Sequence, residues 1–219
     1  MNDLALFDPG LRRGWGRLTW VGLCLAAACS SGPPPPATTG PSHTDRVEQD
    51  RAAKDEAFRL GADSPIPEAQ RATFTGLTYF PIDASYSVPA SIAAERSAEP
   101  VIIELATSRN TVDRLERVGT ITFRLAGTRH SLTAFATAED GLNRLFVPFG
   151  DLTNRHETYG GGRYLNLTRT ATGLYDLDFN AAFNPYCVYD VNYTCPLPPA
   201  ENRLQVAIRA GERMPESHR

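Results

Sequence analysis

The chain has 219 residues and a formal net charge of −3 at pH 7, with 22 lysines and arginines against 25 acidic residues. This mildly acidic balance excludes the basic surface that a nucleic-acid-binding protein needs, so we expect no nucleic-acid partner. The length is that of one domain once the N-terminal segments are set aside.

The first 28 residues have the pattern of a secretory signal. Three arginines (Arg12, Arg13 and Arg17) precede the apolar run of residues 18–28, which is shorter than the roughly 20 residues that span a bilayer. The run ends in "LAAAC", which resembles the bacterial lipobox, where small residues precede an invariant cysteine. The resemblance implies cleavage before Cys29 and attachment of lipid to that residue.

Residues 29–43 are expected to form a disordered tether behind the lipid. The stretch "SSGPPPPATTGPSH" is rich in proline, serine and glycine and cannot bury enough apolar surface to fold. A lipidated cysteine, a tether and a domain are the parts of a surface lipoprotein. We therefore expect a protein of the cell envelope, outside the cytoplasm, attached to the membrane by its lipid anchor, with residues 44–219 forming one β-rich domain.

The domain is predicted to begin with one helix, in "TDRVEQDRAAKDEAFRLG". Asp45 and Glu48 give a start that resembles a capping box, and Gly61 suits the position after the last turn. The apolar stripe is thin, with Val47 and Phe58 among its few members, so we expect the helix on the domain surface. The following "SPIP" ends it, because proline cannot continue a helix.

From residue 74 onward, short runs of β-branched and aromatic residues recur between glycine, proline and asparagine, which predicts strands. In "TITFRLA" and "RLQVAIR" apolar and polar residues alternate, as in antiparallel strands with one buried face. Many short strands after one helix indicate a mainly β fold, either an antiparallel β-sandwich or an open barrel, and the pattern does not choose between them. The expected strands are residues 74–80, 86–92, 101–107, 118–126, 130–137, 145–149, 163–169, 174–180 and 203–210.

Long motifs in the domain carry a family resemblance. They occur in the order "FTGLTYFPID", "LFVPFGDLTNRHETYGGGRYLNL" and "DFNAAFNPYCVYDVNYTCPLPPAENRLQVAIRAGE". Together they resemble the domain of unknown function 1684 family over nearly the whole chain after the tether. The resemblance implies no reaction, because the family has no assigned activity. It marks these positions as matching the family's pattern: Asp151, Thr153, Glu157, Thr158, Tyr159, Gly162, Arg163, Tyr164, Asp178, Phe179, Asn180, Asn184, Pro185, Cys187, Tyr189, Cys195, Pro196, Pro198, Pro199, Asn202 and Glu212.

Cys187 and Cys195 are expected to form a disulfide. Seven residues separate them, and the signal places them outside the cytoplasm, where disulfides persist. A metal pair is one alternative, but structural zinc sites use closely spaced cysteines with further Cys or His ligands, and no second pair occurs. Free thiols are the other alternative. We expect no metal ion and no other cofactor.

The predicted strand "LYDLDFN" has a polar face. Its period of two puts Asp176, Asp178 and Asn180 on one side. Carboxylate and amide oxygens of this kind suit a hard cation or an acid–base pair. The alternative is structural, because aspartate and asparagine side chains cap turns, and Asn184 before Pro185 favours a turn.

The stretch "HETYGGGRY" offers a second set of candidate ligand contacts. Its glycines let a ligand approach the backbone closely, and Arg163 suits a carboxylate or a phosphate. The alternative is a glycine-rich turn with Arg163 in a structural ion pair. The sequence contains no nucleophile motif such as G-x-S-x-G, so we assign no catalytic residue.

The site hypothesis joins these two segments. The turn "ATG" lies between residues 163–169 and 174–180, so the strands should pair as a hairpin that brings Arg163 beside Asp178 and Asn180. The expected function is a non-catalytic module that binds a small polar ligand, a glycan or an envelope protein. The alternative is a metal- or carboxylate-dependent hydrolase acting on envelope material. The candidate ligand-binding residues are Glu157, Tyr159, Arg163, Asp178, Asn180, Asn184 and Asn202.

Overall fold

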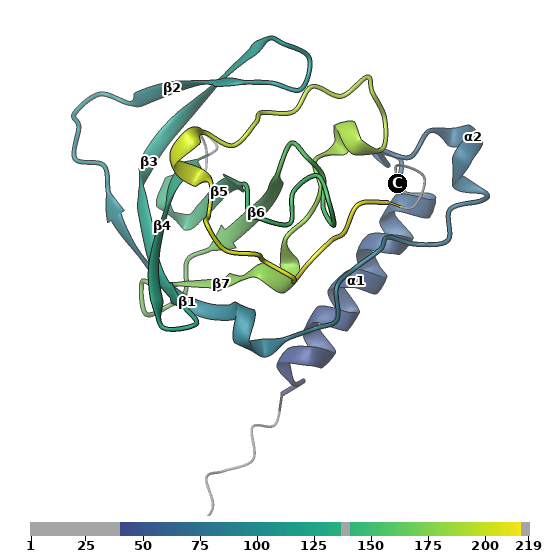
Figure 1. The fold of residues 1–219 in the computed structure, drawn as a ribbon, viewed down its shortest axis with the longest axis horizontal. Coiled ribbons are helices and arrows are strands. Elements are labelled where there is room, and N and C mark those ends of the chain that lie inside the picture. Colours follow the sequence, from purple (N-terminus) through teal and green to yellow (C-terminus); the bar gives the residue numbers. More distant parts are fainter. Residues whose placement is uncertain (1–39, 137–140, 216–219) are drawn as a thin grey trace, which may run out of the picture. The chain divides into compact units, whose positions relative to one another are not determined.

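The computed structural model describes residues 40–136 and 141–215, so the predicted signal, Cys29 and most of the tether lie outside the described residues. In this part, six strands form a nearly closed antiparallel barrel in the order β6–β5–β4–β3–β1–β7, and α1 precedes it (Figure 1). The fold is mainly β, as expected, and of the two expected architectures, sandwich and open barrel, it is the barrel. The helices and strands are α1 His43–Leu60, α2 Glu68–Arg71, β1 Ser87–Ala94, β2 Val101–Ala106, β3 Val112–Leu125, β4 Thr128–Ala136, β5 Arg144–Phe149, β6 Arg163–Thr168 and β7 Tyr175–Asp178.

β3 is the longest strand and takes part in two different pairings on one of its sides. Its residues 112–117 pair with β2, and its residues 119–123 pair with β1. A β-bulge separates the two parts at Gly119, whose φ is +153° and where a Cβ would lie 2.4 Å from the carbonyl oxygen of Ala93. The sequence predicted only the second part, because the first part, "VDRLER", has charged or exposed residues on both faces.

The barrel interior is filled by side chains that alternate along the strands. Ile121, Phe123 and Leu125 of β3 are buried, which confirms the alternation seen in "TITFRLA". Tyr175 and Leu177 of β7 belong to the same buried cluster. Burial of one large apolar side chain stabilises the fold by about 1.5–3 kcal/mol, so this cluster holds the barrel together.

β6 and β7 do not form the predicted hairpin ladder. The turn between them forms, and Arg169 bridges Tyr175, but β6 then runs beside β5 while β7 runs beside β1. The start of β6 is bridged instead by a later residue, since Tyr164 and Phe183 exchange two backbone hydrogen bonds of 2.8 and 3.0 Å. The barrel wall is therefore open between these two bridges.

The chain turns away from the strand direction at the end of β7. The side chain of Asp178 accepts a hydrogen bond of 2.9 Å from the backbone N–H of Asn180 and caps the 3-10 helix η3, Phe179–Ala181. The chain leaves the strand direction there. The bridge between Arg169 and Tyr175 also sets a register in which Asp178 would lie opposite Asn166, so the turn does not bring Arg163 beside Asp178.

The expected strand at residues 203–210 is also not a strand. Residues 203–214, here called the C-terminal strap, form an irregular segment, the yellow stretch that crosses the barrel in Figure 1. Its apolar residues still alternate, and Leu204, Ile208 and Ala210 are buried in the barrel core. Alternation thus predicted burial correctly, but the strap joins no strand ladder. It is held by single bridges, by scattered backbone hydrogen bonds such as that from Glu212 to the Ala182 carbonyl oxygen, and by bonds from side chains. The expected strand at residues 74–80 likewise reduces to one bridge.

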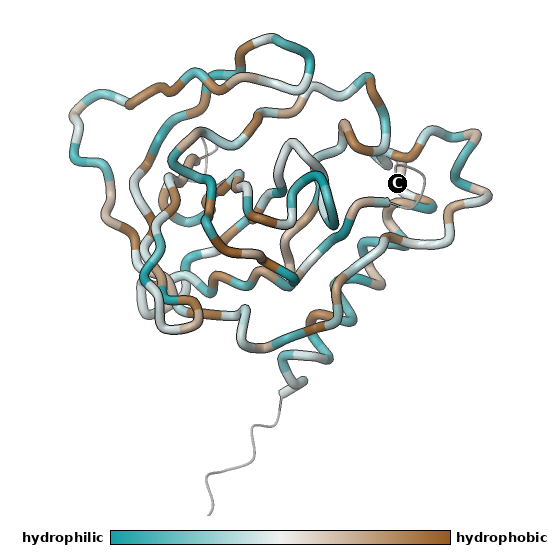
Figure 2. Tube along the Cα trace, viewed as in Figure 1, coloured by the Kyte–Doolittle hydropathy of each residue, from teal (hydrophilic) through white to brown (hydrophobic). Residues whose placement is uncertain are grey.

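α1 lies against the barrel and has few apolar contacts. Its N-cap is Ser42, which forms a capping box with Asp45, so the predicted start with Glu48 in that role was wrong. Val47 and Phe58 are its buried residues, and Figure 2 shows the helix as largely hydrophilic. The helix therefore depends on polar contacts for its position. None of the helices in the described part of the chain is long and apolar enough to cross a membrane.

Candidate functional site

Arg163, the cation of the site hypothesis, is fully buried and has a structural role. It forms an ion pair of 2.9 Å with Asp151, and the side chains of both residues are 0% exposed. Its guanidinium also donates to three carbonyl oxygens of the C-terminal strap, those of Ile208 at 2.7 Å, Ala210 at 2.5 Å and Glu212 at 3.1 Å. Burial lowers the pKa of Arg163, and the Asp151 carboxylate partly offsets that effect. The arginine ties the strap to the barrel.

Asp151 completes this connection from the other side. Its Oδ1 accepts from the backbone N–H of Thr153 at 2.8 Å, from the Thr153 hydroxyl at 2.6 Å and from the backbone N–H of Ile208 at 3.1 Å. Both carboxylate oxygens are therefore occupied inside the protein. The ion-pair alternative for Arg163 is found, with Asp151 as the partner in place of Asp178.

The glycine-rich segment allows close packing of the chain on itself. Gly162 has a φ of +94°, a conformation that other residues rarely adopt. A Cβ there would lie 2.6 Å from the carbonyl oxygen of Phe149 and 2.6 Å from Cγ of Pro198. The segment is therefore a glycine-rich turn, as in the structural alternative. The groups that approach Gly162 closely belong to the protein itself and not to a ligand.

Asn202 is fully buried and completes the barrel wall between β4 and β5. These strands share one ladder pair, Phe135 with Phe146. The Oδ1 of Asn202 accepts from the Thr133 backbone N–H at 2.6 Å, and its Nδ2 donates to the carbonyl oxygens of Thr133 and Pro148 at 2.9 and 2.7 Å. The side chain thus supplies hydrogen bonds that a continuous ladder would have made.

Asn184 belongs to a buried cluster around Glu212. One carboxylate oxygen of Glu212 accepts from the Asn184 backbone N–H at 2.7 Å and from the Tyr189 hydroxyl at 3.0 Å, and the other pairs with Lys54 at 2.5 Å. The Lys54 ammonium also lies 4.6 Å from the ring centroid of Phe183, within cation–π range. This Glu212 cluster fastens α1 to the strap.

Asp178 and Asn180 lie together beneath α1. The Oδ2 of Asp178 lies 2.6 Å from Nε2 of His43, and its Oδ1 accepts from Nδ2 of Asn180 at 2.8 Å. Asn180 also exchanges two hydrogen bonds with the backbone of Asp83, of 3.0 and 2.8 Å. In residues 40–136 and 141–215, no group of three His, Cys, Asp or Glu side chains comes together as a metal ion would require.

Glu157 and Tyr159 have separate surroundings. Glu157 pairs at the surface with Arg209, at 3.0 Å. Tyr159 is half-buried beside Cys187, and burial, followed by the effect of that cysteine, raises the pKa of Tyr159 to about 12. These two side chains share no hydrogen bond with Asp178 or with the Glu212 cluster in the part of the chain that is described.

Cys187 and Cys195 are neighbours and are free thiols in this structure. The backbone N–H of Cys187 lies 3.2 Å from Sγ of Cys195. A hydrogen bond from Cys195 lowers the pKa of Cys187 to about 6, which favours the thiolate from which a disulfide forms. Their disulfide stays a prediction.

The seven candidate ligand-binding residues therefore fall into several environments. Glu157 and Tyr159 lie apart from the other five. Asp178 and Asn180 line a common hollow beneath α1. Three residues are fully buried: Arg163, Asn184 and Asn202. Arg163 and Asn184 both bond to Glu212, while Asn202 bonds to β4 and β5.

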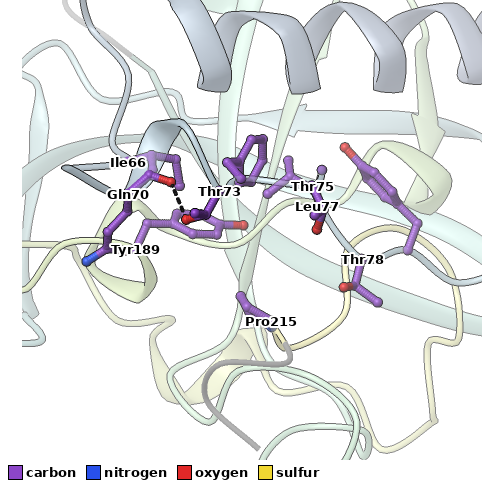
Figure 3. A pocket seen from close by; sticks show the side chains of 11 residues that line it. Ile66, Gln70, Thr73, Thr75, Leu77, Thr78, Tyr189 and Pro215 are labelled. Carbon is purple, nitrogen blue, oxygen red and sulfur yellow. Dashed lines mark hydrogen bonds between the residues drawn. The ribbon is translucent and has the colours of Figure 1, made fainter. Parts of the chain in front are cut away.

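The larger hollow lies around residues for which the sequence predicted a strand. This threonine pocket has a volume of about 570 Å³, within the ~300–1,000 Å³ typical of small-molecule sites. Figure 3 shows side chains from distant segments around it, and the hydroxyl of Thr73 donates to the Gln70 carbonyl oxygen at 3.0 Å. None of its lining residues among those described carries a formal charge. Its polar side chains are Gln70, Thr73, Thr75, Thr78, Tyr79 and Tyr189.

Sequence reasoning missed this pocket. The available signal is the run of hydroxyl side chains in "ATFTGLTYF". That signal was ambiguous, because threonine and tyrosine are also favoured in strands.

A smaller hollow, here called the Arg51 hollow, lies between α1 and the barrel. Its volume is about 130 Å³, and it shares only Tyr79 with the threonine pocket. From α1 it is lined by Val47, Asp50, Arg51 and Lys54, and from the rest of the domain by Tyr79, Asp178, Asn180, Ala181, Ala182 and Glu212.

Comparison with known proteins identifies the family but adds no activity. No curated protein matches the chain. Among solved structures, the chain is similar to the solution NMR structure of an uncharacterised protein from Haloarcula marismortui. The two are 39% identical with a TM-score of 0.61, and the match covers 77% of this chain and 92% of that one. The family model "Protein of unknown function (DUF1684)" matches residues 72–213, which contain the barrel and nearly all of the C-terminal strap. The chain therefore belongs to the DUF1684 family of proteins of unknown function.

Proposed function

We propose that this protein is lipid-anchored in the cell envelope and that its barrel domain binds a small uncharged polar ligand in the threonine pocket without hydrolysing it. The observation that carries the proposal is the lining of that pocket, where hydroxyl and amide groups occur without any charged side chain among the described residues. Such groups donate to and accept from neutral partners such as sugar hydroxyls. Acid–base or metal-assisted hydrolysis would need carboxylates, imidazoles or a metal at the reacting bond.

The positions of the charged side chains support binding over hydrolysis in the threonine pocket. Arg163 and Asp151 are buried, pair with each other and bond to the C-terminal strap, so neither is available to a substrate. Lys54 and Glu212 hold α1 in place. A hydrolase would be expected to bring two such groups to the wall of the larger pocket, within reach of a substrate.

The Glu212 cluster also makes part of the threonine pocket rigid. Tyr189 lines the pocket, donates its hydroxyl to Glu212, and packs edge-on against Phe58 with 5.3 Å between the ring centroids. Tyr79 lines the pocket as well, and its backbone bridges that of Glu212. A wall that is already ordered loses little conformational entropy when a ligand binds.

The ligand-binding part of the proposal is tested with the disaccharide of N-acetylglucosamine, a neutral envelope-type sugar. We expect the purified full chain to bind it and to leave its glycosidic bond intact. Thr75→Val and Thr78→Val each remove one hydroxyl at nearly constant volume, so each should weaken binding about fivefold, the value of one hydrogen bond. Calorimetric titration measures the affinity, and chromatography of the sugar detects cleavage.

Thr168→Val is the matched control, because Thr168 is exposed at the end of β6 and outside the threonine pocket. It should leave the affinity unchanged. Release of the monosaccharide by the protein would contradict the non-catalytic part of the proposal. Equal binding by the wild type and both pocket variants would contradict the assignment of the site.

The anchoring part of the proposal rests on the lipobox-like sequence before Cys29. Cys29→Ser should move the protein from the membrane fraction to the soluble fraction or leave an uncut precursor, because no residue remains to carry the lipid. Cell fractionation and intact mass measure both effects. Cys24→Ser, five residues earlier in the signal, is the control and should change neither. Normal processing and membrane attachment of Cys29→Ser would refute the anchor.

A further inference from the structure

The Arg51 hollow is lined by two residues that each have a buried hydrogen-bond donor without an acceptor. Nε of Arg51 and the hydroxyl of Tyr79 are buried and have no partner among the described residues. The two side chains are adjacent, because the Arg51 guanidinium lies 4.3 Å from the centroid of the Tyr79 ring. Three other arginines among the described residues also have a buried Nε without a partner, but Tyr79 has the one unpartnered buried hydroxyl in this part of the chain. Two such donors side by side at one hollow point to an acceptor that binds there.

Arg51 also lacks a counter-charge in direct contact. Its terminal nitrogens donate to the carbonyl oxygens of Phe80 at 3.0 Å and Asn180 at 3.3 Å, which are neutral. In residues 40–136 and 141–215, no carboxylate forms an ion pair with it. Burial lowers the pKa of Arg51, which reflects the cost of keeping this charge away from water, and the neighbouring Tyr79, Asp178, Glu212 and Glu48 offset only part of that effect. An anion in the hollow would offset that cost.

The carboxylates around the hollow are already engaged by other groups. Glu212 is paired with Lys54 at 2.5 Å, and Asp178 contacts the imidazole of His43 at 2.6 Å. Asp50 is exposed, so water and salt screen its charge. Arg51 is thus the cation at this hollow that remains available for an incoming anion.

Tyr79 keeps its proton under ordinary conditions. Burial, followed by the nearby carboxylate of Glu212, raises the pKa of Tyr79 above its usual value. Its hydroxyl therefore stays a neutral donor at physiological pH. A bound oxygen atom could accept from Tyr79 and from the Nε–H of Arg51.

The size and walls of the hollow restrict the rest of the ligand. A volume of about 130 Å³ corresponds to about four water molecules of ~30 Å³ each, or to a carboxylate with a two- or three-carbon chain. Val47, Ala181 and Ala182 supply apolar surface. We propose that the Arg51 hollow binds a short aliphatic carboxylate, whose charged end meets Arg51 and Tyr79 and whose alkyl chain contacts these three residues.

The test uses propionate and the purified full chain, with binding followed by saturation-transfer NMR titration. Tyr79→Phe keeps the ring beneath Arg51 and removes a hydroxyl that has no partner, so the fold should be unaffected while propionate binds about fivefold more weakly. Arg51→Met should weaken binding at least about tenfold, because hydrogen bonds to charged groups are stronger. Arg59→Met, near the C-terminal end of α1 and paired with Glu56, is the matched control and should bind normally.

The charge of the ligand and the position of its site are tested separately. Propionamide has the same shape without the charge, and it should bind at least about tenfold more weakly than propionate. Thr75→Val should leave propionate binding unchanged, which distinguishes this site from the threonine pocket. The proposal is overturned if propionate fails to bind at tens of millimolar, so that only water occupies the hollow. Equal binding of propionamide, or unchanged propionate affinity in Tyr79→Phe, overturns it as well.

Discussion

Replacing Arg163 by methionine is expected to lower the free energy of unfolding by about 3–5 kcal/mol, the range found when one member of a buried ion pair is removed. The substitution leaves the Asp151 carboxylate buried without its cation. It also removes the donor from three carbonyl oxygens of the C-terminal strap. For a domain of this size each kcal/mol corresponds to roughly 3 °C, so the melting temperature should fall by about 9–15 °C.

Two further variants separate the buried charge from the loss of a side chain. Arg209→Met removes an arginine whose side chain is 60% exposed in its pair with Glu157, and it should change stability by less than about 1 kcal/mol. The double variant Arg163→Met with Asp151→Asn removes the uncompensated carboxylate, so it should be more stable than Arg163→Met alone. A loss below about 1 kcal/mol in Arg163→Met would refute a structural role for this ion pair.

Replacing Asn202 by aspartate is expected to lower the free energy of unfolding by about 3 kcal/mol at neutral pH, although the two side chains have nearly the same shape. The carboxylate cannot donate to the carbonyl oxygens of Thr133 and Pro148, which lie 2.9 and 2.7 Å from the amide nitrogen. It also places a negative charge against these oxygens, where β4 and β5 have few other hydrogen bonds.

The destabilisation should depend on pH with a definite sign. Burial and the two carbonyl oxygens should raise the pKa of the new carboxyl in the folded state above its value in the unfolded chain. The protonated form is then favoured by folding, and the stability lost at pH 7 should be partly recovered as the pH falls toward 5. Denaturant unfolding at both pH values measures this effect.

Asn166→Asp is the matched control for Asn202→Asp. Asn166 is exposed on β6, so the same chemical change should alter stability by less than about 0.5 kcal/mol at either pH. Equal effects at the two positions would show that the Asn202 amide does not bridge β4 and β5.

Local patterns in the sequence were enough to predict the class of the fold and the burial of many residues. Alternation identified Ile121, Phe123 and Leu125 as an inward face, and it identified Leu204 and Ile208 as buried even though the strap is not a strand. These predictions succeeded because a side chain's transfer from water depends on its own apolar surface, which the sequence gives directly. Barrel and sandwich share the same period of two, so that pattern could not distinguish them.

The candidate site was only partly predictable, because its outcome depended on which distant groups meet. From the sequence we predicted a hairpin that would make Asp178 the partner of Arg163. In the folded chain Asp178 caps the 3-10 helix η3, and Arg163 pairs with Asp151. Capping is a local bond that competes with strand continuation, and β7 pairs with β1 and not with β6.

By itself, the sequence determined the family, the mainly β class and the inward face of the strands. It also predicted a lipoprotein-like leader, which stays an expectation. Only the tertiary structure decided the closure of the barrel, the partner of Arg163 and the role of Asn202, which bridges two strands 54 and 69 residues earlier in the chain. It also decided the threonine pocket, which draws Ile66, Tyr189 and Pro215 to one place. The physical reason is that hydrophobic burial and turn capping depend on neighbouring residues. Pockets and buried ion pairs depend instead on the register and curvature of strands far apart in sequence, which no local pattern encodes.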